Sequence, residues 1–421
     1  MLKIKKYSIG EGILLVVAGA SLLPAITATL GLRQLPAISA LFAVLYVGLA
    51  CAAVKKIKIL AGKSLVLIAL LLWTVVMFLR GLKVDYEFFY SVLIVPYVFL
   101  PFTFPFVAAT FREHHLHRLY QVIGALNIAY LIFVALNAQR LISGVEGGVA
   151  VVENVTHYLA FPNFLMLFSL YRVGILRRLV SISVYFVGLF ASLYFARRGL
   201  TWTFACGGFL AISLLLFDSG LSVRRRMIWL FGFLGVVLAA SYVLWENSQS
   251  LLGPLMDRLF EDSRGWVLKD FEQDMGALDL LFGRGIGGTY FLSVSDVEGV
   301  SGRARGIIES GYLNIILYGG YIYLGLLGLM YGRAIYRGIF RSHNSLAKAL
   351  ACFIIMHVLE LYPAGVLFFN IQFLIIWIAI ALCLDRNFIR SKNGLSLERS
   401  SNNRVLIPSG AMAADRTIRR F

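Results

Sequence analysis

The chain has 421 residues, of which 59% are hydrophobic and 14% are charged, and its mean hydropathy is +0.81. Ordinary globular domains carry about 45–50% apolar and about 25% charged residues, so this composition excludes a single water-soluble domain. The net charge of +17, from 39 Lys and Arg against 22 Asp and Glu, would suggest nucleic acid binding in a soluble protein. In a membrane protein it is typical of basic cytoplasmic loops.

The apolar residues form blocks of about 20 residues, the length with which a helix crosses a hydrocarbon layer about 30 Å thick. We predict twelve membrane-spanning helices, at 10–30, 36–54, 64–80, 88–110, 119–137, 156–172, 179–196, 200–217, 227–245, 307–332, 346–362 and 365–384. The sequence therefore predicts an all-α integral membrane protein.

The distribution of charge between the loops predicts the orientation of these spans. With the N-terminus in the cytoplasm, 27 of the 39 basic side chains fall in cytoplasmic segments, and 15 of the 22 acids fall outside. Because basic residues accumulate on the cytoplasmic side, both termini are expected there.

Loop lengths divide the chain into four predicted parts. Helices one to nine form a membrane domain at 1–245, and helices ten to twelve complete it at 307–384. The intervening 246–306 alternates apolar and charged residues in a helix-like pattern, which predicts an ordered extracytoplasmic loop subdomain. The segment 385–421 is rich in Ser, Asn and Arg without apolar periodicity, and is expected to be a disordered basic cytoplasmic tail.

Several arginines are predicted to lie outside the membrane, against the general distribution of charge. They stand near helix ends, at Arg197, Arg198, Arg264, Arg284, Arg303 and Arg305. The guanidinium fork matches phosphate oxygens in pairs and keeps its charge near a membrane. Such arginines would suit a lipid-linked diphosphate; alternatively they contact lipid headgroups or pair with acids of the same loop.

The segment Gly283–Gly288 has the spacing G-x-G-x-x-G, but no strand precedes it in a βαβ unit, which argues against dinucleotide binding. We expect a turn that lets the backbone approach a ligand or a helix. Acids of the same loop offer oxygen ligands for a divalent cation, at Asp270, Glu272, Asp274, Asp296 and Glu298. A solvated amphipathic helix explains the first three equally well, and no metal site is predicted.

Three residues are candidates for a general base. Glu309 stands at the apolar boundary where span 307–332 begins, and such a boundary would raise the pKa of its carboxyl towards the range useful to a general base. His357 and Glu360 are spaced i, i+3 and therefore share one face of span 346–362. Two interpretations of these residues remain open, a functional pair and a hydrogen-bonded structural pair. His157, at the start of span 156–172, is interpreted as an interfacial residue.

The order of these features resembles that of the bacterial O-antigen polymerases in the O-antigen ligase/polymerase superfamily, which are C-type integral-membrane glycosyltransferases. The shared features are twelve spans, a large external loop between spans nine and ten, an Arg-Gly pair at Arg198, an Arg-x-x-x-x-x-Asp-type helix from Arg264, and the Gly-Arg-Gly turn at Arg284. The topology covers the whole chain, whereas the residue motifs cover about 195–325.

The start of span 307–332 adds to the resemblance. Glu309-Ser310-Gly311-Tyr312-Leu313, followed by Gly319-Gly320, is similar to the corresponding segment of exopolysaccharide polymerases. The ligases of the superfamily carry a histidine near this point and this chain does not, which favours a polymerase over a ligase and leaves the identity of the base open.

The resemblance implies roles for individual residues. Arg198, or its neighbour Arg197, and Arg264 would hold the lipid diphosphate, with Arg284 and Arg305 in the same external set of arginines. Trp266 and Tyr312 would contact the substrate, and the catalytic group would come from Glu309, His357 or Glu360.

The implied reaction is the polymerisation of undecaprenyl-diphosphate-linked repeat units into O-antigen of lipopolysaccharide, capsular polysaccharide or exopolysaccharide. A sugar hydroxyl of one unit attacks the anomeric carbon of another chain, and undecaprenyl diphosphate leaves. The expected enzyme is a metal-independent glycosyltransferase without a cofactor, multi-pass in the bacterial inner membrane, with its active site facing the periplasm. Expected partners are the lipid-linked oligosaccharides, membrane lipids, a chain-length regulator and a flippase, and no nucleic acid.

Two other functions remain open. An O-antigen ligase would transfer finished polymer to the lipid A core, and a lipid or solute transporter would carry out no chemistry. Transporters often contain inverted repeats and helices broken within the membrane. The single large loop at 246–306 and the scarcity of polar residues within the spans argue against a transporter.

Overall fold

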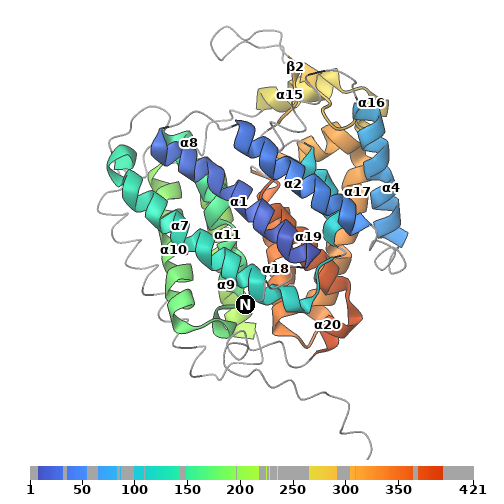
Figure 1. Cartoon of the computed structure of the whole chain (residues 1–421). Coiled ribbons are helices and arrows are strands. Elements are labelled where there is room, and N and C mark those ends of the chain that lie inside the picture. The colour runs from blue at the N-terminus through green and yellow to red at the C-terminus, as the bar shows by residue number, and fades with distance from the viewer. Residues whose placement is uncertain are drawn as a thin grey trace, which may run out of the picture.

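The body of the protein is a bundle of long apolar helices, and a small cap of two helices and a two-stranded sheet covers one end of it (Figure 1). The computed structural model describes residues 8–31, 36–54, 65–82, 86, 99–108, 110–142, 148–195, 197–217, 224, 227, 235, 265–291, 304–308, 310–363 and 368–391.

Most predicted spans correspond to helices. These are α1 (Ile9–Leu30), α2 (Pro36–Val54), α4 (Leu65–Gly81), α7 (Leu116–Ile142), α10 (Ile175–Tyr194), α11 (Arg198–Phe217), α17 (Gly311–Phe340), α18 (Ser345–Glu360) and α19 (Ile371–Leu384). Within the described part of the chain, five helices are long and apolar enough to cross a membrane. The α-helical, membrane-embedded character predicted from the sequence is therefore confirmed. Nearly all of the predicted span 227–245 lies outside the described residues, as do 88–98, 246–264, 292–303 and 392–421.

The predicted span 156–172 is not one continuous helix. The chain runs from α8 (Gly148–Val155) into a single π-helical turn, η3 (Thr156–Ala160), and then into α9 (Asn163–Phe168) and a short 3-10 turn, η4 (Leu170–Arg172). Pro162 lies at the break, where its ring nitrogen has no proton to give to a preceding carbonyl. The remaining short helices are η1 (Leu100–Thr103), α6 (Phe104–Ala108), η2 (Glu113–His115) and α20 (Arg386–Arg390).

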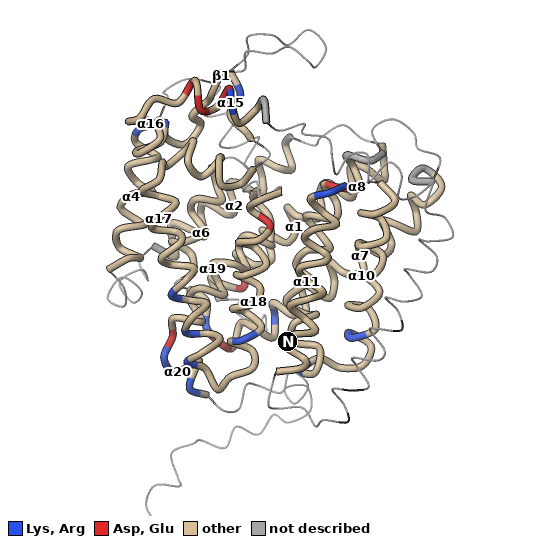
Figure 2. The backbone as a smooth tube through the Cα atoms, turned by 180° about the vertical axis from the view of Figure 1, so that it is seen from behind, with Lys and Arg blue, Asp and Glu red and all other residues tan. Residues whose placement is uncertain are grey.

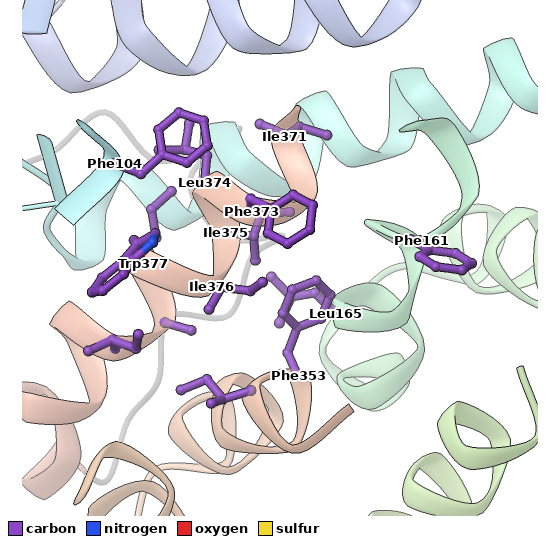
Figure 3. Close-up of a cluster of buried hydrophobic side chains, with 14 of the residues drawn as sticks. Phe104, Phe161, Leu165, Phe353, Ile371, Phe373, Leu374, Ile375, Ile376 and Trp377 are labelled. Carbon is purple, nitrogen blue, oxygen red and sulfur yellow. The ribbon is translucent and has the colours of Figure 1, made fainter. Parts of the chain in front are cut away.

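The core of the bundle is built around α19. This helix is apolar around its whole circumference, and nearly all of its residues are buried, as expected for a helix without a solvent face. It packs against α1, α6, α17 and α18. Figure 3 shows side chains of α19, Phe373 and Ile376 among them, facing Leu165 of α9 and Phe353 of α18. The N-cap Asn370 accepts a hydrogen bond from the backbone N–H of Phe373 at 3.1 Å, and this bond defines where α19 begins.

The cap consists of α15 (Gly265–Asp274), α16 (Ala277–Phe282) and two antiparallel strands, β1 (Tyr290–Phe291) and β2 (Ala304–Arg305). The turn Gly283–Gly288 connects the cap to the bundle and contacts α17. The contact lies where α17 is interrupted at Gly320, whose φ is 68°. The backbone N–H groups of Arg284 and Gly285 donate to carbonyl oxygens in the kink at 2.7 and 3.0 Å. The expectation that this glycine turn lets the backbone approach a helix is therefore confirmed.

Charged residues gather at the two ends of the bundle. Figure 2 shows Lys and Arg grouped around α20 with some acids beside them, and acidic and basic residues again lie together near α15 and α8 at the other end. The helical segments between the two ends carry few charged residues, as the apolar interior of a bilayer requires.

Candidate functional site

A cluster of four polar side chains lies inside the bundle. Glu360 is 2% exposed and His357 is fully buried. The Glu360 carboxylate contacts two imidazoles, with its Oε1 3.6 Å from Nδ1 of His157 and its Oε2 3.7 Å from Nδ1 of His357. Gln372 donates its side-chain N–H to Oε2 of Glu360 at 2.6 Å. One buried carboxylate is thus held between two histidines and an amide.

Three separate elements bring this cluster together. His357 and Glu360 lie on the last turn of α18 and face the same way, as their i, i+3 spacing predicts. Gln372 is the second residue of α19. His157 lies on the π-helical turn η3, and single π turns of this kind are frequent at functional sites.

The last turn of α18 is also tied to the start of two other helices. At the start of α17, the phenol of Tyr312 donates to the carbonyl oxygen of Val358 at 2.7 Å, and Gly311 N–H donates to that of Leu361 at 3.0 Å. From α11, the indole of Trp202 donates to the carbonyl oxygen of Leu359 at 3.2 Å. These bonds satisfy carbonyl groups that a helix leaves without an internal partner at its C-terminus.

The first turn of α11 brings positive charge close to the cluster. Arg198 is the first residue of α11, and its predecessor Arg197 forms an ion pair with Glu153 of α8 at 3.1 Å. Glu153 lies one turn before His157 in the continuous segment formed by α8 and η3. The N-terminus of a helix carries a partial positive charge, so the two guanidinium groups and the end of α11 have the same sign.

Arg284, expected among the diphosphate ligands, is engaged within the cap. Its Nε donates to Asp279 at 2.9 Å, while its terminal nitrogens donate to the carboxylate and carbonyl oxygens of Asp274 and to the carbonyl oxygen of Thr289 at 2.8 Å. Partial burial lowers the pKa of Arg284, but the hydrogen bonds and negative charges of Asp274 and Asp279 outweigh it, and the net shift is upward. The guanidinium group therefore stabilises the turn Gly283–Gly288 at any ordinary pH.

The other predicted site residues are distributed as follows. Arg305 lies exposed on β2, opposite Tyr290. Arg264 and Glu309 lie outside the described residues, as does the side chain of Trp266. The structure thus brings Tyr312, His357 and Glu360 together at the end of α18, places Arg197 against Glu153, one turn before His157, and leaves Arg284 and Arg305 in the cap.

The polar cluster has the composition of a proton-transfer site. A carboxylate between two imidazoles can share or exchange a proton with either of them, and burial strengthens these interactions. Both ring nitrogens of His357 lack a hydrogen-bond partner, which is unusual for a fully buried polar side chain. Within the part of the chain that the structure describes, no group of three or more His, Cys, Asp or Glu residues could hold a metal ion.

Sequence reasoning did not place His157, Trp202 or Gln372 in this site. His157 and Trp202 meet the α18 terminus through contacts between residues far apart in the chain, and Gln372 meets it from the start of the next helix. Hydrophobic periodicity does not predict contacts between different helices. The one available signal was the presence of an ionisable residue, His157, within an apolar block close to Pro162.

Comparisons with protein-family models, with curated proteins and with solved structures find no match to this chain.

Proposed function

We propose that this protein is a polysaccharide polymerase that joins undecaprenyl-diphosphate-linked repeat units at the periplasmic face of the inner membrane. It would have about twelve membrane spans in a C-type glycosyltransferase architecture. One observation carries the proposal: the arginine-bearing start of α11 and the start of α17, which follows Glu309, are hydrogen-bonded to the same turn of α18. That turn carries His357 and Glu360. The resemblance assigned these segments to diphosphate binding and to the chemistry, and they lie together.

The arginine end of the site fits the departure of a lipid diphosphate. Arg198 begins the apolar helix α11 and Arg197 directly precedes it, so their charges lie where a headgroup would reach while the lipid tail remains in the bilayer. Breaking the bond between the anomeric carbon and the diphosphate leaves negative charge on the departing oxygens. Preorganised guanidinium groups stabilise this charge without a metal ion.

The polar cluster fits the activation of the acceptor. A sugar hydroxyl must lose its proton as it attacks the anomeric carbon, and a nearby histidine or carboxylate can accept it. Glu360 and its two imidazoles provide such groups beside the arginine end, through the ion pair of Arg197 with Glu153 and the bond of Trp202 with Leu359. We assign Arg264, Trp266 and Glu309 to the proposed site as well, whereas Arg284 and Arg305 belong to the cap.

Deletion of the gene tests the reaction type. A strain without the polymerase is expected to place single repeat units on the final carrier and to lose the ladder of long chains. A strain without a ligase would accumulate long polymer on undecaprenyl diphosphate and leave the lipid A core bare. The lipid-linked repeat unit extracted from the deletion strain is then the substrate for purified protein in lipid nanodiscs, which should form polymer from it. Long lipid-linked polymer in the deletion strain would contradict the proposal.

One observation favours a second candidate, a proton-coupled transporter of a lipid or solute. Buried ionisable residues within membrane helices often belong to proton pathways, and His157, Glu360 and His357 form such a cluster. Proteoliposomes distinguish the two functions. A transporter would produce proton uptake with its solute and no glycosidic bond, whereas the polymerase would produce polymer in the absence of a proton gradient.

A further inference from the structure

We propose that His157 is the residue that accepts the proton of the attacking sugar hydroxyl, and that Glu360 positions it. The inference rests on the proposed polymerase function and names the general base that the sequence left open. Neither the periodicity of the chain nor its motifs single out His157. The contacts of the π-helical turn η3 identify it instead.

Accessibility separates the two histidines of the cluster. The side chain of His357 is fully buried, and its ring is enclosed edge-on by the rings of Tyr331 and Phe373, with centroids 5.8 and 5.3 Å away. The side chain of His157 is 12% exposed. A substrate hydroxyl can therefore approach His157, whereas His357 has no free edge towards it.

The orientation of His157 is the one that a general base requires. Its Nδ1 lies 3.6 Å from Oε1 of Glu360, so Nε2 is directed to the other side of the ring. A carboxylate at one imidazole nitrogen fixes the tautomer and stabilises the imidazolium that forms when the other nitrogen takes a proton. The ring of Phe161 meets that of His157 edge to face at 4.4 Å and restricts its rotation.

Glu360 is itself held in place. Gln372 donates to its Oε2 at 2.6 Å, and His357 contacts the same oxygen at 3.7 Å, so that Oε1 remains for His157. The π turn is anchored on its other side, where the hydroxyls of Tyr130 and Thr156 hydrogen-bond at 3.2 Å. His357 and Gln372 thus act through Glu360, as positioning residues.

The proposed step balances as follows. The acceptor oxygen forms a bond to the anomeric carbon of the donor, and the bond from that carbon to the diphosphate oxygen breaks. The electron pair of the broken bond leaves with undecaprenyl diphosphate, next to Arg197 and Arg198. The hydroxyl proton moves to Nε2 of His157, which later releases it to water. No oxidant, reductant or metal ion takes part in this step.

The neighbouring charges are compatible with this role. Glu360 of α18 faces His157 directly, and Glu153 lies one turn earlier on α8, where it is neutralised by Arg197 at the start of α11. From α7, Tyr130 contacts the preceding residue Thr156. The one carboxylate that contacts the imidazole in the described residues is therefore that of Glu360.

The experiment measures polymer formation by purified protein in nanodiscs as a function of pH, together with binding of undecaprenyl diphosphate alone. His157→Gln is expected to lower the turnover rate by about 10²–10⁴-fold. The remaining activity should no longer fall on acidification, because glutamine has no ring nitrogen that acidification could protonate, and binding of undecaprenyl diphosphate should be unchanged. Glu360→Gln should lower the rate less and change the pH profile.

The matched control is His114→Gln, the same substitution at an exposed histidine at the opposite end of the bundle, which should leave rate and pH profile unchanged. Normal rates and a normal pH profile in folded His157→Gln, with wild-type protein active, would overturn the role of His157 and leave the polymerase proposal intact. Wild-type protein that forms no polymer from the lipid-linked substrate would overturn both. If His157→Gln does not fold, a changed pH profile in folded Glu360→Gln supports the proposal and an unchanged profile contradicts it.

Discussion

The indole nitrogen of Trp202 donates a hydrogen bond to the carbonyl oxygen of Leu359 at 3.2 Å. Trp202 lies one turn after Arg198 on α11, and Leu359 directly precedes Glu360 on α18. The bond therefore joins the helix that carries the arginines to the turn that carries the polar cluster. Together with the packing of α11 against α18, it holds the two halves of the proposed site in their relative position.

Substitution of Trp202 by Phe tests this contribution. The change removes the indole N–H and keeps an aromatic ring, so we expect a small loss of stability, about 1 kcal/mol. We expect a larger loss of polymerisation, up to on the order of 10²-fold, because small misplacements of reacting groups are costly. Trp73→Phe is the matched control, since Trp73 donates a similar bond, 2.9 Å long, to Gly319. Equal activity of the two variants would argue against a coupling role for Trp202.

Arg198→Lys is expected to be nearly inactive. Lysine keeps the charge but loses the forked donors that bind two phosphate oxygens. Loss of one charge-assisted contact to a developing anion costs on the order of 10²–10³ in rate. Chain-length ladders from a complemented deletion strain give the measurement, with membrane levels compared by immunoblot. Arg305→Ala, at an exposed position on β2, should retain the ladder; a normal ladder from Arg198→Lys would exclude bidentate binding there.

The orientation of the chain can be tested with single cysteines at exposed positions on opposite ends of the bundle. Thr289 lies in the cap and Asn387 lies on α20, and both are exposed. We expect an impermeant maleimide to label Thr289→Cys in intact spheroplasts and Asn387→Cys after permeabilisation, in a background without the four native cysteines. The opposite pattern would place the proposed site on the cytoplasmic side and contradict the polymerase mechanism.

Gly320→Ala is expected to destabilise the folded protein. The φ of 68° at Gly320 disfavours any side chain by about 1–2 kcal/mol, and an added Cβ would lie 2.2 Å from the carbonyl oxygen of Leu281. Gly328→Ala, in the same helix, meets nothing within 4 Å and should be neutral or stabilising. Melting temperatures and gel-filtration profiles in detergent check both variants. Equal melting temperatures would show that the kink does not need glycine.

Hydropathy alone predicted much of the bundle. The bounds of α2 were predicted at 36–54 and found at Pro36–Val54, and α11 begins two residues before the predicted 200. The length of an apolar block predicts the length of the helix, because both are determined by the thickness of the bilayer. The same signal predicted one helix at 156–172, because η3 and α9 are as apolar as a continuous helix. The break at Pro162 follows from backbone geometry, which hydropathy does not report.

The site was predictable in part. The spacing of His357 and Glu360 gave their shared face, since it depends on helix geometry alone. The contact of Glu360 with His157 joins residues 203 positions apart, and it depends on the packing of α18 against α9, the helix that follows η3. The carboxylates that bind Arg284 are close to it in sequence. Whether this guanidinium group binds Asp274 or a ligand, however, depends on how the cap folds.

The length of α18 has a consequence for the depth at which the proposed chemistry takes place. Its 16 residues make a helix about 24 Å long, which is shorter than a hydrocarbon layer of about 30 Å. With the start of α18 at the cytoplasmic edge of this layer, Glu360 at the other end would lie several ångströms below the outer lipid headgroups. An activated glycosyl donor that descends to this level leaves bulk water behind, and the acceptor sugar becomes the nearest nucleophile. A short helix would in this way favour chain growth over wasteful hydrolysis of the donor.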